Sequence, residues 1–134
     1  MLTGIPFFAL AAARLAHASQ RNTVIARNIA NADTPGFKAK DIEPFDFQRM
    51  TARAASGVAP KATRPGHVSK ETLVGPQSEI HDAPATAESP DGNTVSLEEQ
   101  MVQAADTRAI FELAANLYAK NLSLLRTVIG RDRS

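Results

Sequence analysis

The middle third of this chain excludes long helices and central strands. Residues 50–93 contain five of the eight prolines and four of the seven glycines, and large apolar residues are sparse there. Proline and glycine interrupt regular structure, and an irregular connection of this length is unusual inside a compact domain. The two ends must therefore supply the regular structure. From the middle we expect short extended pieces at most, near residues 66–74 and 78–81.

The C-terminal segment has the most regular pattern. Ser96 and Glu99 fit a capping box, and the residues that follow recur at alternating spacings of four and three, as in a coiled-coil seam. Nine of the ten positions in this row are apolar, and the row comprises Leu97, Met101, Ala104, Arg108, Phe111, Ala115, Tyr118, Leu122, Leu125 and Ile129. A second apolar face accompanies its latter half. We predict a helix over residues 97–129 with neighbours on more than one side, because one partner helix could not bury both faces.

The N-terminal segment carries a similar row and then a stop signal. The row comprises Phe8, Ala12, Leu15, Ser19, Asn22, Ala26 and Ile29, which predicts a helix over residues 5–31. Pro35 disfavours the helical conformation in the residue before it. Pro35 and Gly36 suit the two central positions of a type II turn, where glycine supplies the positive φ. We expect Asp33 to hydrogen-bond the amides of this turn.

The apolar start of the chain imitates a secretory signal peptide. No lysine or arginine precedes Arg14, so the positively charged region of such a peptide is missing. The apolar run is also too short to span a bilayer. We therefore predict that this segment is a helix and not a cleaved leader.

Two polar residues interrupt the apolar rows. Asn22 lies in the N-terminal row and Arg108 in the C-terminal row. Each could lie at a solvated edge of its helix. Alternatively, the two could set the register between helices, as a polar core residue does in coiled coils. The sequence leaves both interpretations open.

Composition argues against enzymatic and nucleic-acid-binding functions. The chain has no cysteine, which excludes disulfides and thiolate metal sites, and its three histidines are scattered. No phosphate-binding loop or catalytic triad is visible, so we expect no catalytic residues, cofactor or metal. The net charge of +1 gives no basic footprint for nucleic acid. These features indicate a structural or interaction protein.

One motif gives a resemblance to a known family. Residues 28–38, Asn-Ile-Ala-Asn-Ala-Asp-Thr-Pro-Gly-Phe-Lys, resemble the N-terminal motif shared by bacterial flagellar rod, hook and filament-axis proteins. Residues 95–101, 117–120 and 124–130 are similar to a proximal rod protein of this family. The resemblance covers residues 10–48 and 94–131, with a faint echo at 63–68. The motif and turn residues that it implies are Asn28, Asn31, Asp33, Thr34, Pro35, Gly36 and Phe37.

The resemblance implies a mainly α fold with little β structure. Two long terminal helices would pair antiparallel as a coiled-coil hairpin, joined by a long irregular segment. Residues 1–33 would supply the N-terminal helix of an inner coiled-coil domain, and residues 94–134 its C-terminal helix. Residues 34–93 would form the Pro/Gly-rich connecting segment, which would cover the hairpin and reach neighbouring subunits.

The function implied is that of a proximal rod subunit in the flagellar basal body. Such subunits stack helically around the export channel and transmit motor torque. The implied partners are copies of the chain, other rod proteins, adjacent MS-ring and rod-adaptor proteins, and the flagellar export apparatus. The implied location is the rod in the periplasmic space, reached by type III export without a cleaved signal peptide. Neither nucleic acid binding nor direct membrane insertion is expected.

We expect the assembly interface to use the apolar rows. The residues assigned to it are Phe8, Leu15, Ile25, Ile29, Leu97, Met101, Phe111, Tyr118, Leu122, Leu125 and Ile129. Two alternatives remain open. One is a sister rod protein of the same family. The other is a soluble helical-hairpin adaptor or chaperone that binds partner helices.

Overall fold

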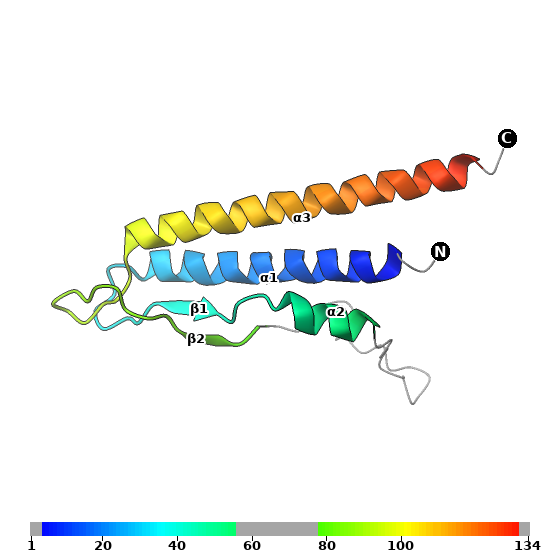
Figure 1. Ribbon diagram of the computed structural model, residues 1–134. Coiled ribbons are helices and arrows are strands. Elements are labelled where there is room, and N and C mark those ends of the chain that lie inside the picture. The colour runs from blue at the N-terminus through cyan, green and yellow to red at the C-terminus, as the bar shows by residue number, and fades with distance from the viewer. Residues whose placement is uncertain (1–3, 56–77, 132–134) are drawn as a thin grey trace, which may run out of the picture.

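Two long antiparallel helices dominate the structure. The computed structural model describes residues 4–55 and 78–131. Helix α1 (Gly4–Ala30) has 27 residues and helix α3 (Leu97–Arg131) has 35. The start of α1 and the end of α3 lie at the same end of the molecule (Figure 1). The predicted mainly α hairpin is therefore confirmed, and both helices begin and end within two residues of the predicted bounds.

A third layer packs against α1 on the side away from α3. Strands β1 (Lys40–Ile42) and β2 (Ile80–Asp82) pair antiparallel, with Lys40 opposite Asp82 and Ile42 opposite Ile80. The short helix α2 (Phe47–Ala55) follows β1, so α1 lies between α3 and this layer (Figure 1). The extended piece predicted near residues 78–81 is confirmed. The piece predicted near 66–74 lies outside the described residues.

Helix α2 was missed by the sequence analysis. Its start is held by Asp46, whose carboxylate accepts a hydrogen bond from the Arg49 amide at 2.9 Å. The Asp46 carbonyl also accepts the Met50 amide at 3.2 Å. Aspartate is among the preferred residues at the position that precedes a helix. One capping side chain therefore begins a nine-residue helix inside a segment that we expected to be irregular.

The capping box predicted for α3 is half formed. The Ser96 hydroxyl accepts the Glu99 amide at 3.4 Å, and the Ser96 carbonyl accepts the Gln100 amide at 2.9 Å. The Glu99 carboxylate does not return to the Ser96 amide but accepts the Thr86 hydroxyl at 3.2 Å. The serine therefore begins the helix, while the glutamate holds the loop that precedes it.

The contact face between the two helices is displaced from the predicted rows. On α3 the buried residues repeat every seven positions, at Gln100, Thr107 and Ala114. On α1 the same repeat occurs at Ala11, Ala18 and Ile25. Each predicted row contains the next residue along, so the buried face is rotated from the predicted seam by up to about 100°, although Phe8 and Tyr118 of the two rows still meet. The hairpin places small and polar side chains in the close contact, and the large apolar ones lie beside it.

The buried core is small and built from short side chains. Its apolar members are Ala11, Ala18, Val24, Ile25, Ala39, Ile42 and Ala114. Several polar residues are equally buried, and among them Asn28 has no exposed surface. Within the described residues, no helix combines the length and hydrophobicity that crossing a bilayer requires. A core this poor in large side chains leaves much apolar surface on the outside of the hairpin.

Candidate functional site

The family motif folds into a tight corner at the end of α1. The Phe37 amide donates to the Thr34 carbonyl at 3.2 Å, and Gly36 between them has a φ of 71°. These features confirm the expected turn with Pro35 and Gly36 at its centre, because a type II turn requires positive φ at its third residue. Asn31 closes the last helical turn, since its side chain donates to the Arg27 carbonyl at 2.8 Å.

A distant residue, Asn93, holds this corner. Its side-chain amide lies within 2.9 Å of the Asn31 and Ala32 carbonyls and 2.8 Å from the Thr34 carbonyl. The last carbonyls of a helix lack partners inside the helix, so this amide caps the C-terminus of α1. The expectation for Asp33 was wrong. Asp33 is exposed, and the amides of Thr34, Gly36 and Phe37 donate to backbone carbonyls instead.

The loop before α3 is clamped along the motif. The Thr94 hydroxyl accepts the Ala39 amide at 2.9 Å, and the Thr94 amide donates to the Phe37 carbonyl at 3.1 Å. Lys38 donates to the Glu88 carboxylate at 2.8 Å and to the Gly92 carbonyl at 3.1 Å. The corner is therefore a joint between the two halves of the chain and not a local helix stop.

The two glycines of this joint lie against each other. The Gly36 amide donates to the Asp91 carbonyl at 2.9 Å. Gly92 has a φ of 83°, and a Cβ atom added there would lie 3.6 Å from the Gly36 Cα atom. That distance is an ordinary contact, so it is the positive φ at both positions that favours glycine over other residues.

Asn28, the first motif residue, is a buried node between three elements. Its side-chain amide donates to the Lys40 carbonyl at 2.7 Å and to the Gln100 side-chain oxygen at 2.9 Å. Its side-chain oxygen accepts the Lys40 amide at 3.0 Å. The orientation of the Asn28 amide is fixed by Lys40, which offers one backbone donor and one backbone acceptor. This node ties α1 to β1 and α3 and sets the register of the hairpin.

Asn22 and Arg108, the polar residues of the predicted rows, do not set that register. Both are exposed. Arg108 donates to the Glu112 carboxylate at 2.9 Å, and this bond raises the pKa of Arg108. The structure favours the interpretation of a solvated edge, and the register role belongs to Asn28 and Gln100.

Charged and polar side chains of α1 and β1 hold the small sheet in place. Arg21 on α1 forms two hydrogen bonds of 3.2 Å with the Asp41 carboxylate. Lys40 pairs with Asp82 across the two strands, and its hydrogen bond and positive charge lower the pKa of Asp82. Gln20 holds the chain before β2 through two bonds to the Ser78 backbone, at 2.7 and 3.0 Å. Sequence reasoning missed these contacts because their partners are far apart in the chain.

Most residues assigned to the assembly interface lie on the surface of the hairpin. Exposed members of that set are Ile29, Leu97, Met101, Phe111, Tyr118, Leu122, Leu125 and Ile129. Phe8 and Leu15 are half-buried, and the Phe8 ring meets the Tyr118 ring edge to face at 5.1 Å. Ile25 is 2% exposed and belongs to the core of its own chain, so its assignment to an interface was wrong.

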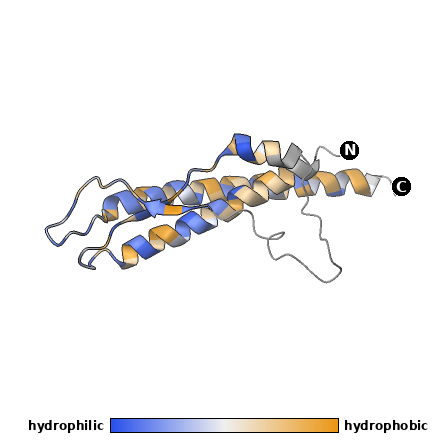
Figure 2. Cartoon of the chain, turned by 90° about the horizontal axis from the view of Figure 1, so that it is seen from below, coloured by the Kyte–Doolittle hydropathy of each residue, from blue (hydrophilic) through white to orange (hydrophobic). Residues whose placement is uncertain are grey.

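The predicted rows border an open groove between α1 and α3. The groove has a volume of about 660 Å³ and is lined by Ala18, Ser19, Asn22, Ala104, Ala105, Thr107, Arg108 and Phe111. Apolar residues continue along α3 to its C-terminal turns, where Figure 2 shows repeated hydrophobic segments. In the part of the chain that the structure describes, no three metal-ligating side chains cluster as an ion site requires.

Comparisons with known proteins agree with the motif. A family model described as "Flagella basal body rod protein" matches residues 9–38. The chain is 34% identical over 116 residues to the flagellar basal body rod protein FlgB of Agrobacterium fabrum, covering 84% of both chains. It is 31% identical over 115 residues to FlgB of Escherichia coli K12, covering 83% of both. FlgB of Cereibacter sphaeroides is 31% identical over 109 residues, covering 81% of this chain and 82% of the relative.

Proposed function

Since the chain belongs to the FlgB family of flagellar basal body rod proteins and is a structural component of the basal body rod, we propose that its copies stack helically around the export channel in the proximal rod. In that position they transmit motor torque toward the hook and filament. Membership of this family also makes the chain a structural protein and not an enzyme.

The exposed apolar surface of α3 carries the proposal. Large apolar residues with at least 37% of their surface exposed are Leu97, Met101, Val102, Phe111, Leu113, Leu117, Tyr118, Leu122, Leu124, Leu125, Val128 and Ile129. They lie on several faces of the helix, so a single neighbour could not cover them all. Extended exposed apolar patches mark interaction sites in soluble proteins. Covering these apolar residues therefore needs neighbouring subunits on more than one side of α3, which is the arrangement in a polymer.

The geometry of the hairpin suits an open assembly. Helix α3 is about 12 Å longer than α1 at 1.5 Å per residue, and Phe8 near the start of α1 meets Tyr118. The last turns of α3, including Leu125 and Ile129, therefore extend past the start of α1. A projecting end on one subunit that fits a groove on the next makes a head-to-tail contact, and such contacts build an open helical assembly when the rotation between subunits does not close a ring.

The proposed partners are other copies of the chain, other rod proteins, neighbouring MS-ring and rod-adaptor proteins, and the export apparatus. We place the chain in the periplasmic part of the basal body, where it arrives by type III export without a cleaved signal peptide. In support, the apolar start of the chain forms the first turns of α1, where Ala11 is buried and Phe8 contacts Tyr118 of α3. A cleaved leader would remove these contacts.

A sister rod protein such as FlgC is not favoured, because the relatives that match over four fifths of the chain are FlgB proteins. A soluble adaptor or chaperone is likewise not favoured by this family membership. Location separates the adaptor from the rod subunit, since an adaptor would remain in the cytosol while a rod subunit copurifies with basal bodies.

The experiment uses Leu125, which is 42% exposed near the projecting end of α3. Leu125→Asp places a charge in a contact without a partner, at a cost of several kcal/mol per interface. We expect the variant to be absent from purified basal bodies and the cells to be non-motile. Leu125→Met nearly conserves volume, costs less than about 1.5 kcal/mol, and preserves motility.

Glu112→Gln is the surface control. Glu112 pairs with Arg108 on the exposed side of α3, where such pairs contribute about 0–1 kcal/mol. We expect motility close to that of the wild type. If Leu125→Asp entered basal bodies and the cells swam, the interface would have to be redrawn around Leu117, Leu124 and Val128. If the wild-type chain were absent from basal bodies, the proposed function would fail.

A further inference from the structure

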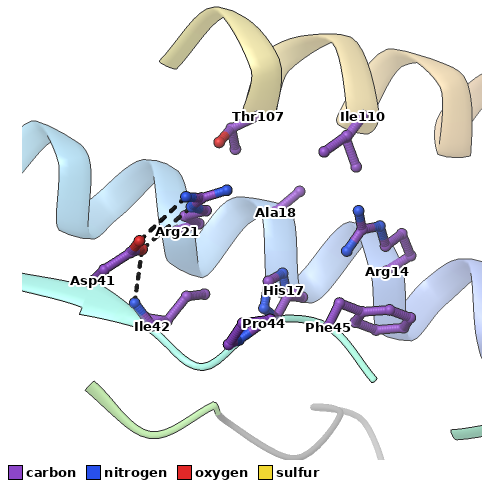
Figure 3. A pocket seen from close by; sticks show the side chains of 10 residues that line it. All are labelled: Arg14, His17, Ala18, Arg21, Asp41, Ile42, Pro44, Phe45, Thr107 and Ile110. Carbon is purple, nitrogen blue, oxygen red and sulfur yellow. Dashed lines mark hydrogen bonds and ion pairs between the residues drawn. The ribbon is translucent and has the colours of Figure 1, made fainter. Parts of the chain in front are cut away.

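A cavity lies where α1, α3 and the connection after β1 meet. Its volume is about 260 Å³, and its polar lining residues are Arg14, His17, Arg21, Asp41 and Thr107. Figure 3 shows the Arg14 and Arg21 side chains extending from α1 into the space beneath α3, with Thr107 above Arg21 and Ile110 above Arg14. The remaining lining residues are apolar. The cavity is distinct from the groove between α1 and α3, although Ala18 and Thr107 border both.

The hydrogen-bond donors in this cavity outnumber its acceptors. Asp41 is the one carboxylate in the lining, and it already accepts two bonds from Arg21 and one from the Ile42 amide. His17 donates through Nε2 to the Glu43 carbonyl at 2.8 Å, because a carbonyl can only accept. Within the described residues, the Arg14 guanidinium forms neither an ion pair nor a hydrogen bond.

Arg14 is held in place without a counter-charge. Its guanidinium carbon lies 4.7 Å from the centre of the Phe45 ring, so the aromatic face supports the cation. Burial, and then the positive charge of Arg21, lower the pKa of Arg14. Both causes disfavour the charged form of the Arg14 guanidinium, and an anion bound in the cavity would offset them.

Thr107 provides a second, independent observation. It is 3% exposed, and its hydroxyl has no hydrogen-bond partner within the described residues. Buried polar groups in native structures are nearly always paired, and each exception requires an explanation. A hydroxyl can donate to an anion that occupies the cavity it borders.

We propose that this cavity binds one carboxylate group, held by the Arg14 guanidinium and the Thr107 hydroxyl. The planar guanidinium matches a carboxylate with two parallel hydrogen bonds. A cavity of about 260 Å³ holds one such group together with some water. The carboxylate comes either from a free small acid or from an aspartate or glutamate side chain of a neighbouring subunit, and the two arms of the test separate these sources.

The first arm uses the purified full chain with acetate as the probe. Acetate is titrated against chloride at constant ionic strength and pH 7, and the Arg14 Nε–H resonance is followed. Binding gives a saturable shift. Thr107→Val should weaken the acetate dissociation constant about tenfold, since one hydrogen bond to a charged group is lost. Arg14→Gln should abolish the response, and Arg27→Gln, an exposed arginine of the same helix, should retain it.

The Thr107→Val variant also controls for folding. Replacing an unpaired buried hydroxyl with a methyl group of similar shape is close to neutral. Without acetate, the variant should therefore unfold at the same urea concentration as the wild type or at a higher one. A large loss of stability would mean that the hydroxyl has a partner inside the protein, and the proposal would be wrong. An acetate response that persists in Arg14→Gln would also overturn it.

The second arm tests a neighbour's carboxylate and rests on the proposed rod function. If acetate does not bind the free wild-type chain, Arg14→Gln should be missing from basal bodies. Arg14→Lys, which keeps the charge but not the two parallel bonds, should be depleted there relative to the Arg27→Gln control. Arg14→Gln present at the wild-type level, or Arg27→Gln missing as well, would overturn the proposal. The rod function is tested separately, by looking for the wild-type chain in purified basal bodies. If the wild-type chain is missing from basal bodies, the second arm does not apply. A failure of acetate to bind the free chain then overturns the carboxylate site by itself.

Discussion

The Asn28 node gives the sharpest test of how the hairpin is held together. Asn28→Ala removes three hydrogen bonds of 2.7 to 3.0 Å at a side chain with no exposed surface. Each bond contributes about 1 kcal/mol net, and each buried partner left unsatisfied adds about 1–3 kcal/mol. The Gln100 side-chain oxygen is such a partner, because Gln100 is 3% exposed. We expect a loss of about 4 kcal/mol, a large part of the stability of a small domain.

The assay is urea unfolding of the full chain, followed by circular dichroism at the helix band. With a slope of about 2 kcal/mol per molar urea, a loss of about 4 kcal/mol lowers the midpoint by about 2 M. Asn22→Ala is the matched control, because it makes the same change at an exposed position of the same helix. Its effect should stay within about 0.5 kcal/mol.

A double-mutant cycle isolates the contact between the helices. Because Asn28 and Gln100 share a hydrogen bond, the loss in the Asn28→Ala, Gln100→Ala double variant should fall short of the sum of the single losses by at least about 0.5 kcal/mol. The reasoning is refuted if Asn28→Ala costs no more than Asn22→Ala. Strict additivity in the cycle would show that the node does not couple α1 to α3.

Three further predictions concern the corner and the small sheet. Asn93→Ala removes the cap on α1 and should cost about 2–3 kcal/mol in urea unfolding, with faster amide exchange at Phe37; exchange as in the wild type would contradict the capping role. Gly36→Val forces a β-branched residue to a φ of 71° and should cost about 1–3 kcal/mol, giving exported protein but non-motile cells in soft agar; wild-type swimming would contradict the turn geometry. Because Lys40 lowers the pKa of Asp82, this pair stabilises the fold above the ordinary aspartate range and the contribution is lost as pH falls through the lowered pKa. A carboxyl NMR titration of Asp82 should show the shift, and Lys40→Met should reduce it but not remove it, because His81 and Lys38 also lower the pKa of Asp82.

The helices and the turn could be predicted from sequence because their signals are local. Ser96 begins α3 at the predicted residue, and Pro35 with Gly36 ends the helical region where the turn chemistry requires. The contact face could not be predicted in the same way. Two rows one residue apart both repeat every seven positions, and the row with larger apolar residues was the better match to a coiled coil. The hairpin instead packs the row of Gln100, Thr107 and Ala114 on α3 against the row of Ala11, Ala18 and Ile25 on α1.

The partners of the corner could not be predicted, because they lie far away in the sequence. Asp33 fits the local turn pattern as well as any residue, yet the capping amide belongs to Asn93. A sequence pattern of period two or 3.6 describes one element and does not say which distant loop meets it. Asn93 follows Asp-Gly and precedes the start of α3. This pattern indicates a turn, but it does not say which distant residues the Asn93 side chain contacts. The cavity at Arg14 was missed for the same reason.

The long separation between paired residues has a consequence for how the chain folds. Asn28 and Gln100 are 72 residues apart, and Asn93 reaches back 62 residues to Asn31, in a chain of 134 residues. Closing so large a loop costs entropy before any of these bonds forms, which slows folding. A chain that threads through a narrow pore therefore cannot lock its hairpin while either half is still inside. If the chain is exported through such a pore, as proposed, the joint would close only after both Asn28 and Gln100 had emerged, whichever end led.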